Sequence, residues 1–156
     1  MDYLYIYGEK IIMSSVEPLY RLASTDLNKF SQDERKILEA GFFSGVCNQL
    51  KNVFRQQHKE YFTLMKFTIQ MENTMLDANF ICLIIKDILS TNEYTMAGIA
   101  HYMNVHEDIL HEIIIGLNTN PSAILLQRVI DLHRSVRADL YREIINKITL
   151  DHAEVA

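Results

Sequence analysis

A capping box followed by a regular apolar stripe is the feature that most limits how this chain can fold. Ser31 and Glu34 are spaced so that each side chain can satisfy a free backbone donor at the start of a helix. Large apolar residues then recur at helical spacing, which predicts a helix from about Gln32 to the mid-fifties. They are Ile37, Leu38, Phe42, Val46 and Leu50. Such a helix needs a partner surface, because helical propensity alone does not stabilise it in water.

The stripe continues toward Met75 without a helix breaker, which predicts either one very long helix or two helices with a bend near Gln57. Its further members are Phe54, Tyr61, Phe62, Met65, Ile69 and Met75. Helical patterns also cover Leu76 or Asp77 to Leu89, two short stretches within residues 95–115, and Ser122 to Leu150. Only five Gly and two Pro occur, too few for the many turns of a barrel or sandwich. We therefore expect an all-α helical bundle with a long N-terminal helical arm.

The pattern divides the chain into three regions that we expect to form one compact domain. Residues 1–75 form the helical arm and a dimerisation region, residues 76–134 hold the paired short helices, and residues 135–156 add a C-terminal helix. Tyr3, Tyr5 and Tyr7 alternate with apolar residues, which suits a short strand or an extended segment before the first helix.

The sequence lacks the features that mark several classes of protein. The apolar stretches are shorter than the ~20 residues of a membrane span, and the N-terminus does not resemble a secretory signal, so we expect a cytoplasmic protein with no membrane partner. Without a glycine-framed nucleophile or a glycine-rich phosphate loop, an enzyme is not expected. Cys47 and Cys82 form no CxxC pair and are expected to be half-buried thiols on helices.

Metal binding is not expected either, and neither is a cofactor. His101, His106 and His111 recur every five residues, a spacing that scatters them around a helix instead of stacking them as metal ligands. His111 with Asp108 and Glu112 could share a face and hold an ion. Exposed polar residues on a surface helix, however, need no metal to explain them.

Residues 95–115 predict two short helices that meet at Asn104. Two helices that cross closely need a small residue at the contact, which Ala100 supplies. The turn between such helices usually requires a left-handed backbone, and Asn is the non-glycine residue that tolerates it best. Apolar residues surround this crossing: Ile99, Met103, Val105, Leu110 and Ile113.

Over about residues 78–134 the chain resembles the helix-turn-helix of Cro/C1-type (XRE-like) transcriptional regulators, including Gly116 and Pro121 after the second helix. The resemblance implies a DNA-binding regulator that acts as a homodimer on double-stranded DNA. Candidate dimer surfaces are the N-terminal arm and the helix Ala138 to Leu150, with Leu140, Ile144, Ile145 and Ile148 on one side. The implied DNA contacts are Thr95 near a phosphate, His106 and His111 near bases, and Asn118 and Asn120 on the backbone.

The charge around this motif does not suit DNA. Between Met71 and Asn120 seven acids face one lysine, a local charge of −6. Glu107, Asp108 and Glu112 in the second helix would need cytosine amino groups or a basic neighbour. Cations that could neutralise phosphates occur in two groups elsewhere. They are Lys51, Arg55, Lys59 and Lys66 on the arm, and Arg128, Arg134, Arg137, Arg142 and Lys147 near the C-terminus.

Two alternatives to a DNA-reading second helix therefore stay open. A protein-interaction module could keep the helix-turn-helix scaffold and use its acidic second helix to bind a basic protein partner, which Ile114 and Ile115 favour. A third possibility is a DNA-binding protein whose contact surface is the basic arm. The same cations could also be a solvated face with intrahelical ion pairs.

Overall fold

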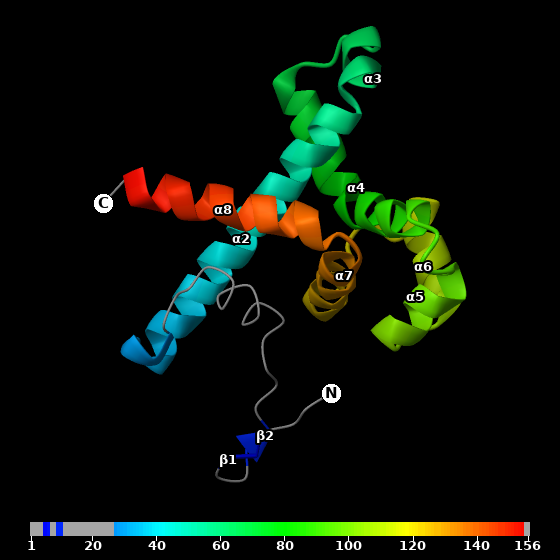
Figure 1. The fold of residues 1–156 in the computed structure, drawn as a ribbon. Coiled ribbons are helices and arrows are strands. Elements are labelled where there is room, and N and C mark those ends of the chain that lie inside the picture. Colours follow the sequence, from blue (N-terminus) through cyan, green and yellow to red (C-terminus); the bar gives the residue numbers. More distant parts are fainter. Residues whose placement is uncertain (1–4, 7–8, 11–26, 155–156) are drawn as a thin grey trace.

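The computed structural model describes residues 5–6, 9–10 and 27–154, and almost all of this part is helical (Figure 1). Two two-residue strands, β1 (Tyr5–Ile6) and β2 (Glu9–Lys10), pair antiparallel, and a 3-10 turn η1 (Leu27–Lys29) precedes the helices. The helices are α2 (Gln32–Gln57), α3 (Lys59–Leu64), α4 (Ile69–Ser90), α5 (Met96–Met103), α6 (Glu107–Ile114), α7 (Ala123–Val136) and α8 (Ala138–Glu154). The all-α prediction is confirmed. Tyr3 and Tyr7 lie outside the described residues.

The start and end of α2 are as predicted. The Glu34 N–H donates to Ser31 Oγ at 3.3 Å, and the Ser31 N–H donates to Glu34 Oε2 at 2.8 Å, so the capping box forms. The helix ends at Gln57, and α3 begins two residues later, so of the two predicted alternatives the break near Gln57 is the correct one. The buried residues of α2 share one face: Phe42, Val46, Leu50 and Phe54.

The chain reverses direction after α3, where the sequence predicted a continuous stripe. Lys66 is left-handed at φ 54°, and the Thr68 side chain caps α4 by accepting from the Met71 N–H at 3.3 Å. Helix α4 therefore begins at Ile69, well before the predicted Leu76 or Asp77. The prediction was wrong because it required glycine or proline to break the stripe, and here a lysine adopts the left-handed backbone.

The C-terminal helical pattern divides into α7 and α8 at Arg137. Ile144, Ile145 and Ile148 of α8 are buried in the core of their own chain. They are not available as a dimer surface, so that part of the prediction was wrong. Leu140 is half-buried and Leu150 is exposed.

The helices form one connected core with two separate ends. Figure 1 shows α2 and α4 side by side, with α3 where they meet and α5 and α6 at the opposite end of α4. Helix α8 crosses α2 at Gly45, whose Cβ position would lie 3.4 Å from Ile148 Cδ1. Helix α7 packs against α4, α5 and α8. None of the helices in the described part of the chain is long and apolar enough to cross a membrane.

Candidate functional site

The pair α5 and α6 is joined by the turn that the sequence predicts. Asn104 adopts φ 52° and ψ 50°, and the Val105 N–H donates to the Ala100 carbonyl at 3.1 Å. Ala100 is buried and α5 contacts α6, in keeping with a small residue near a helix crossing. The predictions for the two helices, for Ala100 and for Asn104 are confirmed.

Side chains and backbone groups close both ends of this pair. Thr95 Oγ1 accepts from the Gly98 N–H at 3.1 Å and caps α5. His106 caps α6 more weakly, because its Nδ1 accepts from the Asp108 N–H at 3.4 Å. After α6, Gly116 is left-handed at φ 79°, and the following N–H groups turn back to the Glu112 carbonyl. The outer face of α6 is thus presented on a well-defined frame.

That outer face is acidic and exposed. The Asp108 side chain is 79% exposed and lies 3.0 Å from His106 Nδ1, while Glu107 Oε1 lies 3.3 Å from His111 Nε2. Glu112 is also exposed. Within residues 28–151, no lysine or arginine forms an ion pair with any of these three carboxylates. The face can therefore attract cations from a partner.

Exposed apolar side chains lie just beyond this face, and a hollow lies between the following loop and α4. Ile115 and Leu117 are exposed just beyond α6, whereas Ile114 is partly buried against the core. Asn118 and Asn120 line a hollow of about 160 Å³ between the loop after α6 and the stretch Asp77–Cys82 of α4. The two asparagines are thus beside α4 and not on the outer face of α6.

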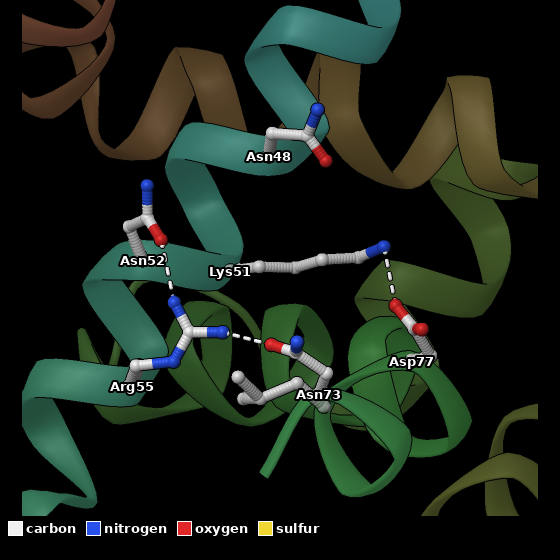
Figure 2. A pocket seen from close by; sticks show the side chains of 7 residues that line it. Asn48, Lys51, Asn52, Arg55, Asn73 and Asp77 are labelled. Atoms are coloured by element: carbon white, nitrogen blue, oxygen red, sulfur yellow. Dashed lines mark hydrogen bonds and ion pairs between the residues drawn. The ribbon is translucent and has the colours of Figure 1, made fainter. Parts of the chain in front are cut away.

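Two of the cations on the N-terminal arm are engaged within the fold. Lys51 Nζ lies 2.6 Å from Asp77 Oδ1, and Arg55 donates hydrogen bonds to Asn52 and Asn73 (Figure 2). Arg55 Nε also lies 3.4 Å from Glu72 Oε2, outside hydrogen-bonding geometry. These contacts join α2 to α4 around a polar cavity of about 360 Å³. Lys51 and Arg55 thus connect α2 to α4 within the fold.

Lys59 and Lys66 of the arm differ from Lys51 and Arg55. Lys59 begins α3 and Lys66 follows its end; both are exposed, and neither has an ion-pair partner among the described residues. Helix α3 lies at the end of α4 opposite to α5 and α6 (Figure 1). These lysines do not add positive charge to the α6 face.

Most of the second group of cations is engaged as well. Arg128 Nη1 donates to the Met103 carbonyl at 2.6 Å at the end of α5, and Arg134 pairs with Asp131 at 2.8 Å. Arg142 pairs with Asp139 on the surface of α8. Lys147 is exposed without an ion-pair partner in the described part of the chain.

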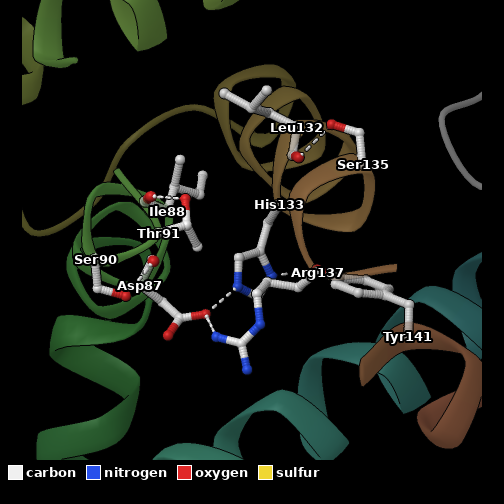
Figure 3. A network of polar contacts seen from close by, with 9 residues as sticks. All are labelled: Asp87, Ile88, Ser90, Thr91, Leu132, His133, Ser135, Arg137 and Tyr141. Atoms are coloured by element: carbon white, nitrogen blue, oxygen red, sulfur yellow. Dashed lines mark hydrogen bonds and ion pairs between the residues drawn. The ribbon is translucent and has the colours of Figure 1, made fainter. Parts of the chain in front are cut away.

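A buried network that the sequence did not suggest joins α4, α7 and α8 (Figure 3). His133 is fully buried, with Nε2 at 2.8 Å from Asp87 Oδ2 and Nδ1 at 2.8 Å from the Tyr141 hydroxyl. Arg137 donates to the same Asp87 oxygen at 2.6 Å. The hydrogen bond from His133 and the charge of Arg137 lower the pKa of Asp87, while burial raises the pKa of Tyr141 well above its usual range.

This network supports the fold and offers no open reactive group. Both ring nitrogens of His133 are engaged, and its side chain has no access to solvent. His133 and Tyr141 are 8 positions apart in the sequence. Asp87 is 46 positions from His133 and 50 from Arg137, so no local sequence pattern indicates this network.

The cysteines and the acidic clusters show no reactive centre. Burial, partly offset by Lys51, raises the pKa of the half-buried Cys47 to about 11. Cys82 is buried, and its Sγ donates to the Ile114 carbonyl at 3.7 Å. In the described part of the chain, no three His, Cys, Asp or Glu side chains gather in a way that could hold a metal ion.

No family model, curated protein or solved structure matches this chain.

Proposed function

We propose that this protein is an interaction module whose acidic α6 face binds a basic protein segment. The observation that carries the proposal is the exposure of Asp108 and Glu112 without a lysine or arginine partner in the described residues. Such carboxylates attract the cationic side chains of a partner. Ile115 and Leu117 beside them supply apolar contact area that a protein partner can bury.

The positions of the cations support a protein partner over a nucleic acid. Affinity for DNA comes largely from lysines and arginines that neutralise phosphates. Of the cations considered for that role, Lys51, Arg55 and Arg137 pair with carboxylates on other helices. Arg128 is bound to a carbonyl. The α6 face itself would repel phosphates.

A second candidate function is a DNA-binding regulator that acts as a homodimer. The left-handed Asn104 and the buried Ala100 favour it, because the resemblance to the Cro/C1-type family implies two short helices joined by a turn of this kind. In this function Thr95, His106 and His111, all exposed, would face the duplex. Two copies would be needed because one reading head buries little surface.

One pair of substitutions separates the two functions, since they predict opposite effects. The variant Asp108→Asn/Glu112→Gln keeps the shape of the face and leaves the Glu107–His111 pair in place. A fluorescent Lys- and Arg-rich amphipathic peptide serves as the probe in an anisotropy titration. We expect the variant to bind the peptide about five- to tenfold more weakly, because each exposed charge pair contributes less than about 1 kcal/mol. Added salt should also weaken the binding of the unmodified protein.

The matched control is Asp139→Asn/Glu143→Gln, which removes two exposed acids from α8. It should leave peptide binding unchanged. The same variants are then tested by electrophoretic shift with genomic and random duplexes across a range of salt. If Asp108→Asn/Glu112→Gln strengthens binding to a duplex and the peptide does not bind the unmodified protein, the interaction module is wrong and the DNA-binding function is supported.

A further inference from the structure

The end of the molecule formed by α3 and the first turn of α4 exposes an unusual number of large apolar side chains. We name this end the α3 tip and define it as residues 59–71. It holds five of the twelve large apolar residues that are exposed in the described part of the chain: Tyr61, Leu64, Met65, Ile69 and Met71. Leu64 is 80% exposed and Ile69 is 74% exposed. Exposed apolar side chains gathered at one end of a molecule often mark a contact with another molecule or with a membrane.

The α3 tip is supported from within by aromatic packing. Phe62 is buried, and its ring centroid lies 5.7 Å from that of Phe67, which in turn lies 5.9 Å from that of Tyr61. The Phe67 N–H donates to the Phe62 carbonyl at 3.1 Å across the reversal. Leu64 and Ile69 are thus presented from an ordered frame, so their insertion into another phase needs little further ordering.

The charge of the α3 tip differs in sign from that of the α6 face. Lys59 and Lys66 are exposed without ion-pair partners among the described residues, and Glu60 is the one acid among residues 59–71. The 22 residues of α4 separate the two ends by roughly 33 Å, several times the Debye length of ~8 Å at physiological salt. The acidic face therefore does not cancel the attraction of the lysines for an anionic surface.

We propose that the α3 tip docks on the surface of an anionic lipid bilayer. Leu64, Met65 and Ile69 enter the boundary between headgroups and acyl chains, while Lys59 and Lys66 contact lipid phosphates. The tip lies at one extremity of the molecule (Figure 1), and a deformable bilayer can receive it without a matching groove. The expectation of no membrane partner rested on the lack of a spanning segment, and a peripheral contact needs none.

The length of α4 would keep the α6 face away from the bilayer surface and in water, where it can meet a partner. The membrane contact itself does not depend on what α6 binds. Its test therefore stands apart from that of the proposed function.

Co-sedimentation of the full chain with vesicles tests this proposal. Vesicles of phosphatidylcholine with a third of phosphatidylserine are compared with vesicles of phosphatidylcholine alone. We expect binding to the anionic vesicles and a loss of about tenfold or more in Leu64→Gln/Ile69→Gln, because each buried CH₂ contributes strongly to partitioning. Both side chains are exposed, so these substitutions should not unfold the protein. The control Ile37→Gln/Ile124→Gln changes two isoleucines that are exposed elsewhere and should bind as the unmodified protein does.

A charge variant tests the role of the lysines. Lys59→Glu/Lys66→Glu should bind anionic vesicles at least about tenfold more weakly, since one lysine near such a surface changes the affinity about fivefold. Lys86→Glu/Lys147→Glu makes the same net change elsewhere and should have a smaller effect. Failure of the unmodified protein to bind anionic vesicles would overturn the proposal, as would equal binding by the tip and control variants. Self-association that Leu64→Gln/Ile69→Gln abolishes, without vesicle binding, would assign the α3 tip to a second copy instead.

Discussion

At the scale of single residues, the turns of this protein depend on side chains that tolerate a left-handed backbone. Three non-glycine residues in the described part of the chain have positive φ: Lys66, Asn92 and Asn104. Asparagine can hydrogen-bond locally and visits this region more readily than other residues with a Cβ. The sequence therefore indicated Asn104, whereas nothing in Lys66 itself suggested that the chain would reverse there.

Asn104→Ala should destabilise the protein, while Asn104→Gly should not. Alanine at φ 52° carries a penalty of about 1 kcal/mol from its Cβ, and glycine at the same position carries none. Urea unfolding followed by circular dichroism measures the difference. If alanine and glycine were equally stable at this position, the turn would not need a left-handed residue.

At the scale of elements, α8 crosses α2 at Gly45, where a Cβ would already be in contact with the facing helix. The Cβ position of Gly45 lies at contact distance from Ile148, whereas that of Gly41, one turn earlier on the same helix, meets nothing within 4 Å. The sequence suggested that these two glycines either weaken the helix or let another helix approach. The structure assigns the close approach to Gly45.

Gly45→Leu and Gly41→Leu form a matched pair that tests this crossing. Leucine at position 45 would push against Ile148 and should lower the free energy of unfolding by about 1–3 kcal/mol, as in other overpacked cores. Leucine at position 41 has open space and should stabilise α2 by up to about 1 kcal/mol through its higher helix propensity. Equal effects of the two substitutions in urea unfolding would mean that α8 does not contact α2 at Gly45.

At the scale of the whole molecule, α4 connects the arm to the paired short helices. It contacts α2, α6 and α7, and the network of Asp87, His133 and Tyr141 joins it to α7 and α8. Buried polar groups stabilise a fold when all of them are paired, and breaking one pair leaves the others unsatisfied. One carboxylate therefore takes part in the contact of α4 with α7 and, through His133, in the contact with α8.

Asp87→Asn should destabilise the protein at neutral pH by about 2 kcal/mol, the size of a lost hydrogen bond to a charged group. The pKa of Asp87 is lowered in the folded protein from its usual 3.8, so its contribution is complete above that value. The contribution is lost as the pH falls through the lower folded pKa. The difference in stability between the unmodified protein and the variant should therefore shrink below about pH 4, which urea unfolding at a series of pH values measures.

The control for this measurement is Asp139→Asn, which removes an exposed ion pair with Arg142. It should change stability by less than about 0.5 kcal/mol. A difference for Asp87→Asn that stays constant down to pH 2 would show that the carboxylate charge does not stabilise the fold.

The sequence by itself determined the helical class, the capping box at Ser31 and the turn at Asn104. Each of these depends on residues within a few positions of one another, whose spacing can be read directly. It also located the acidic segment that begins α6, because charge is a property of composition.

The tertiary structure alone decided which charges remain exposed and which surfaces are used internally. Arg137 meets Asp87 across 50 positions, and Ile144 and Ile145 enter the core because α8 lies across α2. The tertiary structure also decided the chain reversal at Lys66, which interrupts the predicted continuous helical stripe and forms the α3 tip. These outcomes depend on which elements pack together, and local spacing does not specify the partner of a side chain across the core.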